Sequence, residues 1–307
     1  MIEVSQVLKT FGGRRGLDGF SLSVPRGALF GLVGPNGAGK TTLMKVMAGL
    51  IGRDGGSVVI DGHDPASEPL EVRAIIGYQP DFAGVYQGMR VHEYLEFFAD
   101  AFRLGPRKKA AIATALKRCK LEDRPNDFVE ELSFGWKQRL VLAKTLLHDP
   151  KVLLLDEPAT GLDPIARIEL REQLKELNGN GLTILISSHI LADLEDICTH
   201  VAFIAAGKNF AGADQQNVVD LRPVSAGQQE YEIGWIGAGS GKLLQSAPRA
   251  AVVSMKELEG RVLIEGGETE AAEVLRSLIA SGMQVTRFAE ATEGLENRYR
   301  KVFGEKQ

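Results

Sequence analysis

The sequence predicts an α/β protein in which a parallel core sheet carries helices on both faces, followed by a smaller α+β domain. Two apolar runs, "KVLLLDEP" at 151–158 and "LTILISSH" at 182–189, are separated by the helical pattern "IARIELREQLKELN". Continuous apolar runs of this kind are typical of parallel strands that are buried on both faces. At 222–229, "RPVSAGQQ" has no periodicity and is rich in turn-forming residues, which predicts a linker between two domains.

The composition is that of an ordinary globular protein. Its 307 residues are 44% hydrophobic and 25% charged, and the net charge of -4 gives no general attraction to nucleic acid, which is not an expected partner. Cys119 and Cys198 lie far apart without metal-ligand spacing, so neither a disulfide framework nor a zinc site is expected. No run approaches the roughly 18 apolar residues needed to cross a bilayer, so a membrane function would require a separate partner.

The N-terminal part begins with strands and continues with a strand, a loop and a helix. "IEVSQV" and "FSLSV" have the alternation of half-buried strands. "ALFGLV" at 28–33 predicts a buried strand, a glycine-rich loop follows it, and "KTTLMKVMAGL" at 40–50 has apolar residues at helical spacing. The segments "VHEYLEFFADAF" and "PRKKAAIATALKRCKL" predict two helices between residues 91 and 121.

The C-terminal part, residues 230–307, predicts a small α+β domain. The runs "YEIGWI", "RAAVVSM", "RVLIEG" and "MQVTRFA" have the pattern of strands. The segments "TEAAEVLRSLIASG" and "GLENRYRKVFG" at 294–304 have the pattern of helices.

The glycine-rich stretch "GPNGAGKT" at 34–41 matches the pattern G-x-x-x-x-G-K-[ST] between a strand and a helix. Gly37 and Gly39 allow the backbone to turn successive N–H groups toward a phosphate, and the N-terminus of the helix adds partial positive charge. Lys40 can reach the β- and γ-phosphates of a nucleotide, and the Thr41 hydroxyl can ligate magnesium. The sequence therefore predicts a phosphate-binding loop.

Two carboxylates and a histidine follow the later apolar strands. Asp156 ends one strand and Glu157 follows it. A carboxylate at a strand end can hold the shell of a magnesium ion, and the next one can polarise an attacking water. His189 follows the strand "LTILISS" and is placed to contact a γ-phosphate, a role that only its position supports.

Six motifs occur in the order and rough spacing of the ATP-binding-cassette (ABC) ATPases: "GPNGAGKTT", "GYQPD", "LSFGWKQR", "VLLLDEP", "ATGLDP" and "SSHIL". The resemblance covers about residues 1–215. It implies a P-loop NTPase cassette at 1–221, with an antiparallel β subdomain and a helical subdomain at about 85–150 beside the parallel core. It also implies ATP and Mg²⁺ as cofactors.

The resemblance implies roles for individual residues. Glu157 matches the catalytic carboxylate, His189 the switch histidine, and Gln79 a further catalytic residue that senses magnesium. Asp163 matches the loop that crosses a dimer interface. The expected ligands of Mg²⁺ are Thr41, Gln79 and Asp156. The residues expected to contact ATP are Phe11, Gly34, Pro35, Asn36, Gly37, Ala38, Gly39, Lys40, Thr41 and Thr42. Phe11 matches an aromatic that stacks on adenine, and a core aromatic is the alternative.

The stretch "LSFGWKQRL" at 132–140 departs from the L-S-G-G-Q signature of this family. Ser133 and Gly135 match, whereas Phe134 and Trp136 replace a glycine and a glutamine. The groups that meet the γ-phosphate in this family are the serine hydroxyl, backbone N–H groups and the start of the following helix, so we expect the signature to function. The two replacements bear on the affinity and rate of ATP-driven closure.

The segments "KQR" and "PDFAGVYQGMRVHEYLEFF" resemble cassettes of ABC-2 type exporters, which pair with a separately encoded permease, and "EATEGLENRYRKVFG" resembles their accessory domain. The chain holds one phosphate loop and one signature, and in this family each signature closes over the nucleotide of the opposite subunit. The resemblance therefore implies a homodimeric ATPase that drives a permease and lies, in the cytoplasm, on the inner face of the cell membrane.

Two other functions stay open on the sequence. One is a soluble cassette ATPase that acts on DNA or ribosomes, although no coiled-coil insertion, second cassette or basic arm is visible. The other is a non-hydrolysing regulatory cassette. Glu157 and His189 argue against it, whereas Phe134 and Trp136 keep it open. The transported substrate cannot be read from the sequence.

Overall fold

The computed structural model describes residues 1–81, 84–209, 218–220, 228–237, 250–255 and 258–290. The chain forms two compact units, Met1–Leu221 and Arg222–Gln307. Most of the linker predicted at 222–229, and the whole helix predicted at 294–304, lie outside the described residues.

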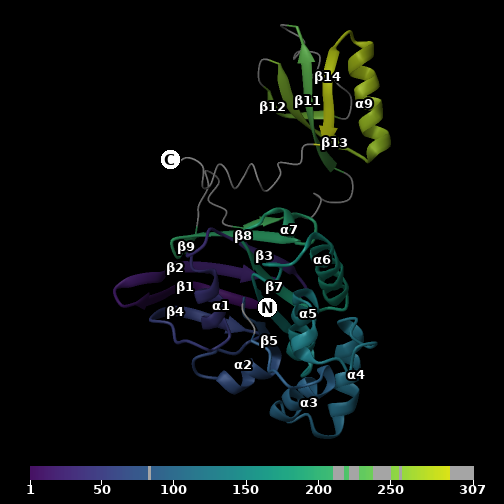
Figure 1. Ribbon diagram of the computed structural model, residues 1–307. Helices are drawn as coiled ribbons and strands as arrows, with labels where there is room; N and C mark the ends of the chain where they lie inside the picture. The colour runs from purple at the N-terminus through teal and green to yellow at the C-terminus, as the bar shows by residue number, and fades with distance from the viewer. Residues whose placement is uncertain (82–83, 210–217, 221–227, 238–249, 256–257, 291–307) are drawn as a thin grey trace. The chain divides into compact units, whose positions relative to one another are not determined.

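A three-stranded antiparallel sheet forms one layer of the first unit (Figure 1). Its order is β2 (Arg14–Val24), β1 (Ile2–Phe11) and β4 (Gly55–Ile60). Val4 of β1 lies opposite Leu22 and Val58, and all three side chains are buried. Because side chains alternate along a strand, these residues give the sheet one apolar face, which packs against the core.

The larger sheet contains the parallel strands. Its order is β10 (Val218–Asp220), β8 (His200–Ala205), β3 (Leu29–Val33), β7 (Thr183–Ser188), β6 (Val152–Asp156) and β5 (Ile76–Gln79), and β9 (Lys208–Asn209) pairs with β8 off this path. Strands β8, β3, β7, β6 and β5 run parallel, whereas β9 and β10 are antiparallel to β8. Every residue of β3, β6 and β7 is buried, as expected for strands covered on both faces.

Helices cover the larger sheet. Helix α1 (Lys40–Met47) shares one apolar cluster with both sheets, in which Leu43 and Met44 are fully buried. Helix α5 (Phe134–Leu146) contacts β5, and α6 (Pro164–Gly179) contacts β7. Helices α3 (Val91–Ala101) and α4 (Lys108–Arg118) contact each other and α5, and the three lie together at one end of the unit (Figure 1). Shorter helices are α2 (Pro69–Ile75), α7 (Ala192–Glu195) and the 3₁₀ turns Gly105–Arg107 and Val129–Glu131.

The second unit is a small α+β domain. Its antiparallel sheet has the order β12 (Ala250–Met255), β13 (Glu259–Glu265), β11 (Gln228–Ile236) and β14 (Gln284–Glu290), and α9 (Glu268–Ala280) follows β13 in the chain. Tyr231, Ile233 and Trp235 alternate along β11 and are buried with Val274 and Leu278 of α9. Apolar residues recur every second position on the strand and at a spacing of four on the helix, so each element has one apolar face, and these two faces pack together.

His148 gives the fold of the first unit a specific sensitivity to acid. It follows α5, and its Nε2 donates to the carbonyl oxygen of Ile76 at 2.7 Å. Its ring stacks on Phe102 with a centroid distance of 4.4 Å. Burial lowers the pKa of His148 below its usual value of 6.5, because the charged imidazolium loses hydration. When the pH falls below the usual pKa of 6.5, this histidine binds a proton in the unfolded chain but stays neutral in the folded chain. The free energy of unfolding therefore decreases as the pH is lowered.

We expect the substitution His148→Gln, which keeps a donor for the Ile76 carbonyl, to weaken the pH dependence of the free energy of unfolding. Between about pH 7.5 and pH 5.5 the wild type should lose more stability than the variant does. Urea unfolding at the two pH values measures the difference. Parallel losses in both proteins would show that His148 is not held neutral by the fold.

Candidate functional site

The glycine-rich loop joins the C-terminal end of β3 to the start of α1. Gly37 and Gly39 have positive φ angles of 78° and 112°, which residues with a side chain rarely adopt. A Cβ atom at Gly34 would lie 2.3 Å from the carbonyl oxygen of Ile204, and one at Gly39 would lie 2.6 Å from that of Gly16. The loop therefore needs glycine for space as well as for conformation, and α1 starts directly after it with unpaired N–H groups.

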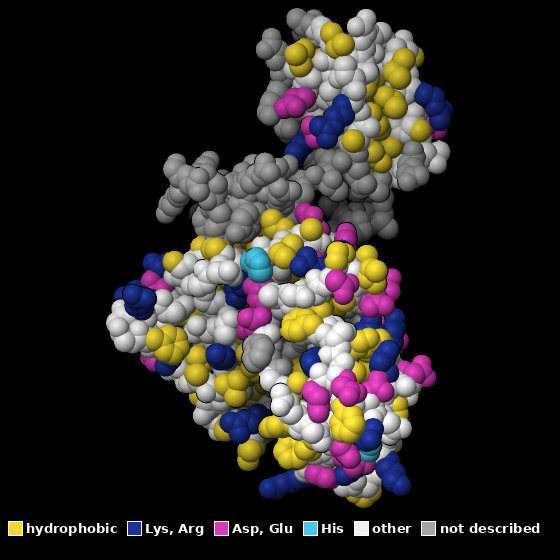
Figure 2. Space-filling model, viewed as in Figure 1, with side chains coloured by type: hydrophobic (Ala, Val, Ile, Leu, Met, Phe, Trp, Pro, Cys, Tyr) yellow, Lys and Arg dark blue, Asp and Glu magenta, His cyan; other side chains and the backbone are white. Residues whose placement is uncertain are grey.

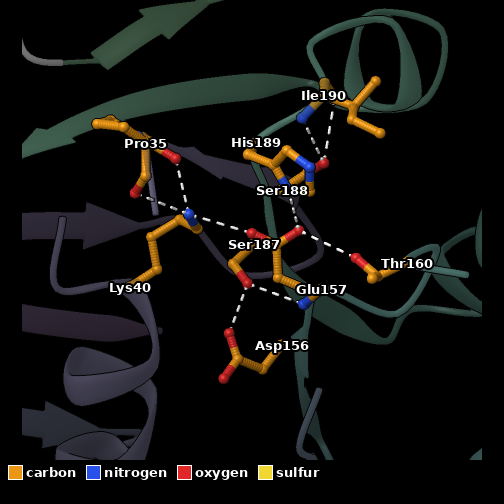
Figure 3. Close-up of polar contacts among 10 residues, drawn as sticks. Pro35, Lys40, Asp156, Glu157, Thr160, Ser187, Ser188, His189 and Ile190 are labelled. Atoms are coloured by element: carbon orange, nitrogen blue, oxygen red, sulfur yellow. Dashed lines mark hydrogen bonds and ion pairs between the residues drawn. The ribbon is translucent and has the colours of Figure 1, made fainter. Parts of the chain in front are cut away.

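The ammonium group of Lys40 contacts both the phosphate loop and Glu157 (Figure 3). Its Nζ donates to the carbonyl oxygens of Gly34 at 2.7 Å and Pro35 at 3.2 Å, and forms an ion pair with Glu157 Oε1 at 3.1 Å. Lys40 is only 5% exposed, and a buried charge is tolerated where it is paired and hydrogen-bonded. The cation that is placed to bind phosphate thus also neutralises the Glu157 carboxylate.

Glu157 connects the ends of two strands. Its Oε2 accepts from His189 Nδ1 at 2.7 Å and from Thr160 Oγ1 at 3.4 Å, and its backbone N–H donates to Ser187 Oγ at 2.9 Å (Figure 3). Its φ angle of 49° is uncommon for a residue with a side chain, and such strain concentrates at functional sites. The side chain of Glu157 is 11% exposed and that of His189 is 39% exposed, so the histidine forms the solvent side of the pair.

Asp156 is fully buried and has one oxygen available. Its Oδ1 accepts from Ser187 Oγ at 2.7 Å, whereas its Oδ2 is buried without a hydrogen-bond partner among the described residues. A buried acceptor left unpaired is costly, and a cation would satisfy it. Within the described ranges no three His, Cys, Asp or Glu side chains form a cage for a metal. Magnesium is commonly held by one or two carboxylates together with substrate phosphates, so this arrangement fits Mg²⁺.

Phe11 lies near the first turn of α1. A Cβ atom at Gly16 would lie 3.0 Å from Phe11 Cε2 and 3.3 Å from Thr42 Cγ2, so the ring and the helix start are close together. Phe11 is 48% exposed, which excludes the core alternative and leaves its ring available for stacking. The remaining predicted ATP contacts differ in exposure: Pro35, Asn36 and Thr41 are exposed, and Ala38 is buried.

Gln79 lies apart from this cluster. It is 2% exposed at the end of β5, and its Nε2 donates to Gln138 Oε1 on α5 at 2.6 Å. Within the part of the chain that the structure describes, no hydrogen bond joins Gln79 to Lys40, Asp156 or Glu157. Its Oε1 is buried without a partner and keeps a free acceptor.

Asp81, two residues further along, approaches the cluster. Gln79 lies opposite Leu155 in the parallel pairing of β5 with β6, so the chain leaves β5 beside Asp156 and Glu157. Loss of hydration and the negative charges of these two carboxylates raise the pKa of Asp81, and the histidine and lysine of the site oppose the shift.

Sequence reasoning did not identify Asp81 as a site residue. It is an acidic side chain two residues after the end of β5, and it is the last residue of the quoted motif "GYQPD". Ser187, whose hydroxyl joins Asp156 to the backbone of Glu157, was also missed, although it lies in the quoted motif "SSHIL".

The signature residues lie on another element. Ser133 is the exposed N-cap of α5, followed by Phe134, Gly135 and Trp136 in its first turn. Among the described residues, no hydrogen bond or ion pair joins these four to the phosphate loop. Asp163 caps α6 by accepting from the Ala166 N–H at 2.9 Å. The structure therefore brings together Lys40, Asp156, Glu157 and His189, and leaves the signature separate from them within one chain.

Magnesium dependence distinguishes the roles of Asp81 and Gln79. We expect Asp81→Ala to raise the Mg²⁺ concentration for half-maximal ATPase activity about tenfold, the lower end of the losses caused by removing groups around a metal. Gln79→Leu removes a hydrogen bond to α5 and should lower the free energy of unfolding by about 1 kcal/mol with little effect on the metal requirement.

Titration of ATPase activity with Mg²⁺ at saturating ATP measures both variants, and urea unfolding controls for stability. The opposite pattern, with a shifted metal requirement in Gln79→Leu alone, would assign the metal to Gln79 instead.

A family model and several curated proteins match this chain. Residues 17–160 match the family model described as "ABC transporter". The chain is 32% identical over 309 residues to the uncharacterized ABC transporter ATP-binding protein YhcH of Bacillus subtilis (strain 168), an alignment that covers 99% of this chain and 96% of that protein. It is 31% identical to the linearmycin resistance ATP-binding protein LnrL of the same organism, covering 91% of this chain and 89% of that protein.

A shorter alignment reaches a third relative. Nod factor export ATP-binding protein I of Rhizobium meliloti (strain 1021) is 36% identical over 220 residues. This alignment covers 71% of the chain and 66% of the relative, so the chain matches just under two thirds of that protein's length.

Solved structures share the fold. An ATP-binding subunit of an ABC transporter has a TM-score of 0.62 at 31% identity, covering 69% of this chain and 88% of that structure. The structure of cbiO1 from Clostridium perfringens, a part of the ABC transporter complex cbiONQ, has a TM-score of 0.62 at 28% identity and covers 68% and 86%. The predicted P-loop cassette fold is thereby confirmed.

Proposed function

This chain belongs to the ABC transporter family of ATP-binding proteins, a family of ATPases, and on that premise we propose that it is the nucleotide-binding subunit of an ABC-2 type exporter. Two copies bind ATP and drive a separately encoded membrane permease. The observation that carries the proposal is the convergence of Lys40, Asp156, Glu157 and His189. Binding of phosphate, binding of a metal and activation of water require these groups in one place.

In the proposed reaction, the γ-phosphate of ATP replaces Glu157 as the ion-pair partner of Lys40. Its Nζ is 3.1 Å from Glu157 Oε1, so a γ-phosphate oxygen competes with this carboxylate for the same ammonium group. When Lys40 binds the phosphate, Glu157 keeps its contacts with Thr160 and His189 and its Oε1 is free to accept a proton from water. The water oxygen then bonds to the γ-phosphorus and the bond to the β–γ bridging oxygen breaks, which gives ADP and phosphate.

The cation fits on the Asp156 side of the cluster. The unpaired Oδ2 of Asp156 and the Thr41 hydroxyl would hold Mg²⁺, with Asp81 as the expected further oxygen donor and Gln79 as the alternative. Bound there, the ion supplies positive charge to the β- and γ-phosphate oxygens. The chain's own contribution is to keep Asp156 fixed through the hydroxyl of Ser187.

A second copy of the chain completes each ATP site in this proposal. Ser133 and Gly135 lie at the open N-terminus of α5, where backbone N–H groups and the helix dipole favour an anion. The sequence has one phosphate loop and one signature, so a C2 dimer in which each signature covers the partner's nucleotide gives two equivalent sites. Asp163, the N-cap of α6, then lies in the interface loop of this dimer.

The names of the relatives support a role in transport, and one of them names export. Their names refer to Nod factor export and linearmycin resistance, and cbiO1 of Clostridium perfringens is part of a transporter complex.

By likeness, we place this chain at the inner face of the cell membrane, bound to a permease. Among the described residues, no helix is long and apolar enough to span a bilayer. Figure 2 shows Lys and Arg side chains interspersed with Asp and Glu on one face of the first unit.

Glu157→Gln separates ATP binding from hydrolysis. We expect steady-state ATPase activity to fall about 100-fold or more, because the amide cannot accept the proton of water. ATP binding should be retained, and ATP with Mg²⁺ should convert the variant from monomer to dimer in size-exclusion chromatography with light scattering.

Lys40→Ala is the matched control, since it removes the phosphate contact and should stay monomeric with ATP. Wild-type turnover in Glu157→Gln would overturn the catalytic assignment. A monomer in every condition would overturn the homodimer for the isolated subunit.

The identity of the binding partner distinguishes a transporter subunit from a soluble ATPase. We expect a tagged Glu157→Gln chain, expressed in its native host, to co-purify with a polytopic membrane protein in mild detergent, because the permease binds the closed dimer. Mass spectrometry of the purified complex identifies the partner. Recovery of ribosomes or DNA without a membrane protein would contradict the transport proposal.

A further inference from the structure

The side chain that replaces a glycine in the signature packs against the interface loop of the same chain. A Cβ atom at Gly161 would lie 3.1 Å from Phe134 Cε1 and 3.4 Å from Cζ, so the ring edge lies directly over this glycine. Gly161 also has a φ angle of 78°, in the left-handed region that favours glycine. Phe134 and Gly161 therefore fit each other: a larger residue at 161 would displace the ring and strain the backbone.

Other contacts fasten the same turn of α5 to the start of α6. A Cβ atom at Gly135 would lie 3.4 Å from the Cβ of Ala166 and 3.8 Å from Leu162 Cδ2, in ordinary van der Waals contact, so this turn and the start of α6 are neighbours. The guanidinium of Arg139, one turn further along α5, forms an ion pair with Glu169 of α6. The signature turn and the loop before α6 are thus packed together as one unit.

Trp136 strengthens the same turn. The guanidinium carbons of Arg124 and Arg139 lie 4.5 and 4.7 Å from its ring centroid, in cation–π contact. Both replacements in the signature therefore have packing partners within the chain.

The interface loop leads from this contact to the catalytic carboxylate. Gly161 is four residues after Glu157, and the turn between them is closed by the hydrogen bond from Thr160 N–H to the Glu157 carbonyl oxygen at 3.1 Å. The Thr160 hydroxyl also donates to Glu157 Oε2 at 3.4 Å. A displacement of Phe134 would therefore move Gly161 and Thr160, and with them the Glu157 carboxylate.

We infer that Phe134 is a positioning residue that fixes the Glu157 carboxylate of its own chain through the loop 158–161. The inference rests on the proposed function, in which the signature turn closes over the nucleotide of the second copy. Under that arrangement Phe134 joins the turn that contacts one ATP to the carboxylate that acts on the other ATP. Closure of the signature in one site then sets the position of Glu157 in the second site.

Mixed dimers test this inference directly. One chain carries the hydrolysis-deficient Glu157→Gln and a second affinity tag, so that each purified mixed dimer has one active carboxylate. In the first arrangement Phe134→Ala is placed on the chain with intact Glu157. In the second it is placed on the chain that carries Glu157→Gln. The inference predicts that the first arrangement hydrolyses ATP about tenfold more slowly than the second, a loss in the range caused by small misplacement of a catalytic group.

The expected loss is in kcat rather than in ATP affinity, because the contact of Phe134 seen here is with Gly161 and not with the phosphate loop of its own chain. Phe134→Tyr in the first arrangement keeps the ring and should restore the rate. Phe97→Ala is a matched control, since Phe97 is 46% exposed compared with 45% for Phe134 and lies on α3, away from the site. Its mixed dimers should hydrolyse ATP at the wild-type rate.

Equal rates in the two arrangements, or a slower second arrangement, would overturn the inference. The latter result would show that Phe134 acts on the nucleotide of the other subunit. Failure of the proposed function looks different: chains with unaltered Phe134 would then form no ATP-dependent dimer or show no ATPase activity, which removes both proposals together.

Discussion

The arrangement of the site depends on the parallel register of β3, β7 and β6. Val33 lies opposite Ser188 and Asp156 lies opposite Ser187, so the three strands end at one edge of the sheet. The phosphate loop, Glu157 and the histidine of the site begin directly beyond those ends, where open α/β sheets bind their ligands. Ser187 on the middle strand holds both Asp156 and the backbone of Glu157. A slip of one residue in β7 would turn its hydroxyl to the other face of the sheet and release both.

The charges at this edge of the sheet explain why the binding of a nucleotide should favour the binding of a metal ion. The Lys40 ammonium pairs with the Glu157 carboxylate, and loss of hydration, together with the negative charges of Asp156 and Glu157, raises the pKa of Asp81. A triphosphate would add more negative charge to the same space, which is unfavourable without further cations. A divalent ion beside the unpaired oxygen of Asp156 removes this conflict. Binding of ATP and of Mg²⁺ should therefore be positively coupled, each raising the affinity for the other.

The sequence was sufficient for features that depend on local pattern. The apolar runs predicted the parallel strands, and Lys40, Asp156, Glu157 and His189 could be proposed because Lys40 lies in the glycine-rich motif and the other three lie at or directly after a strand end. Gln79 and Asp81 depend instead on which face of β5 a side chain occupies. Gly77 packs against Thr145 of α5, so Gln79, two residues later, points to the same helix. Nothing in the local pattern reveals how the chain turns after the strand and carries Asp81 toward the site.

The altered signature has two changed side chains, and both of them pack within the chain. The groups it offers to an anion are the Ser133 hydroxyl and the backbone N–H groups at the start of α5, and these depend on the position of the turn rather than on the side chains at 134 and 136. Phe134 packs on Gly161, and Trp136 packs between two guanidinium groups, so both rings lie against protein. Such packing restricts the turn, whereas glycine at 134 would leave it more conformational freedom. In the proposed dimer, a preorganised turn would lose less entropy when it closes on a phosphate, so the replacements would favour a signature that is fixed in place before the nucleotide of the second copy arrives.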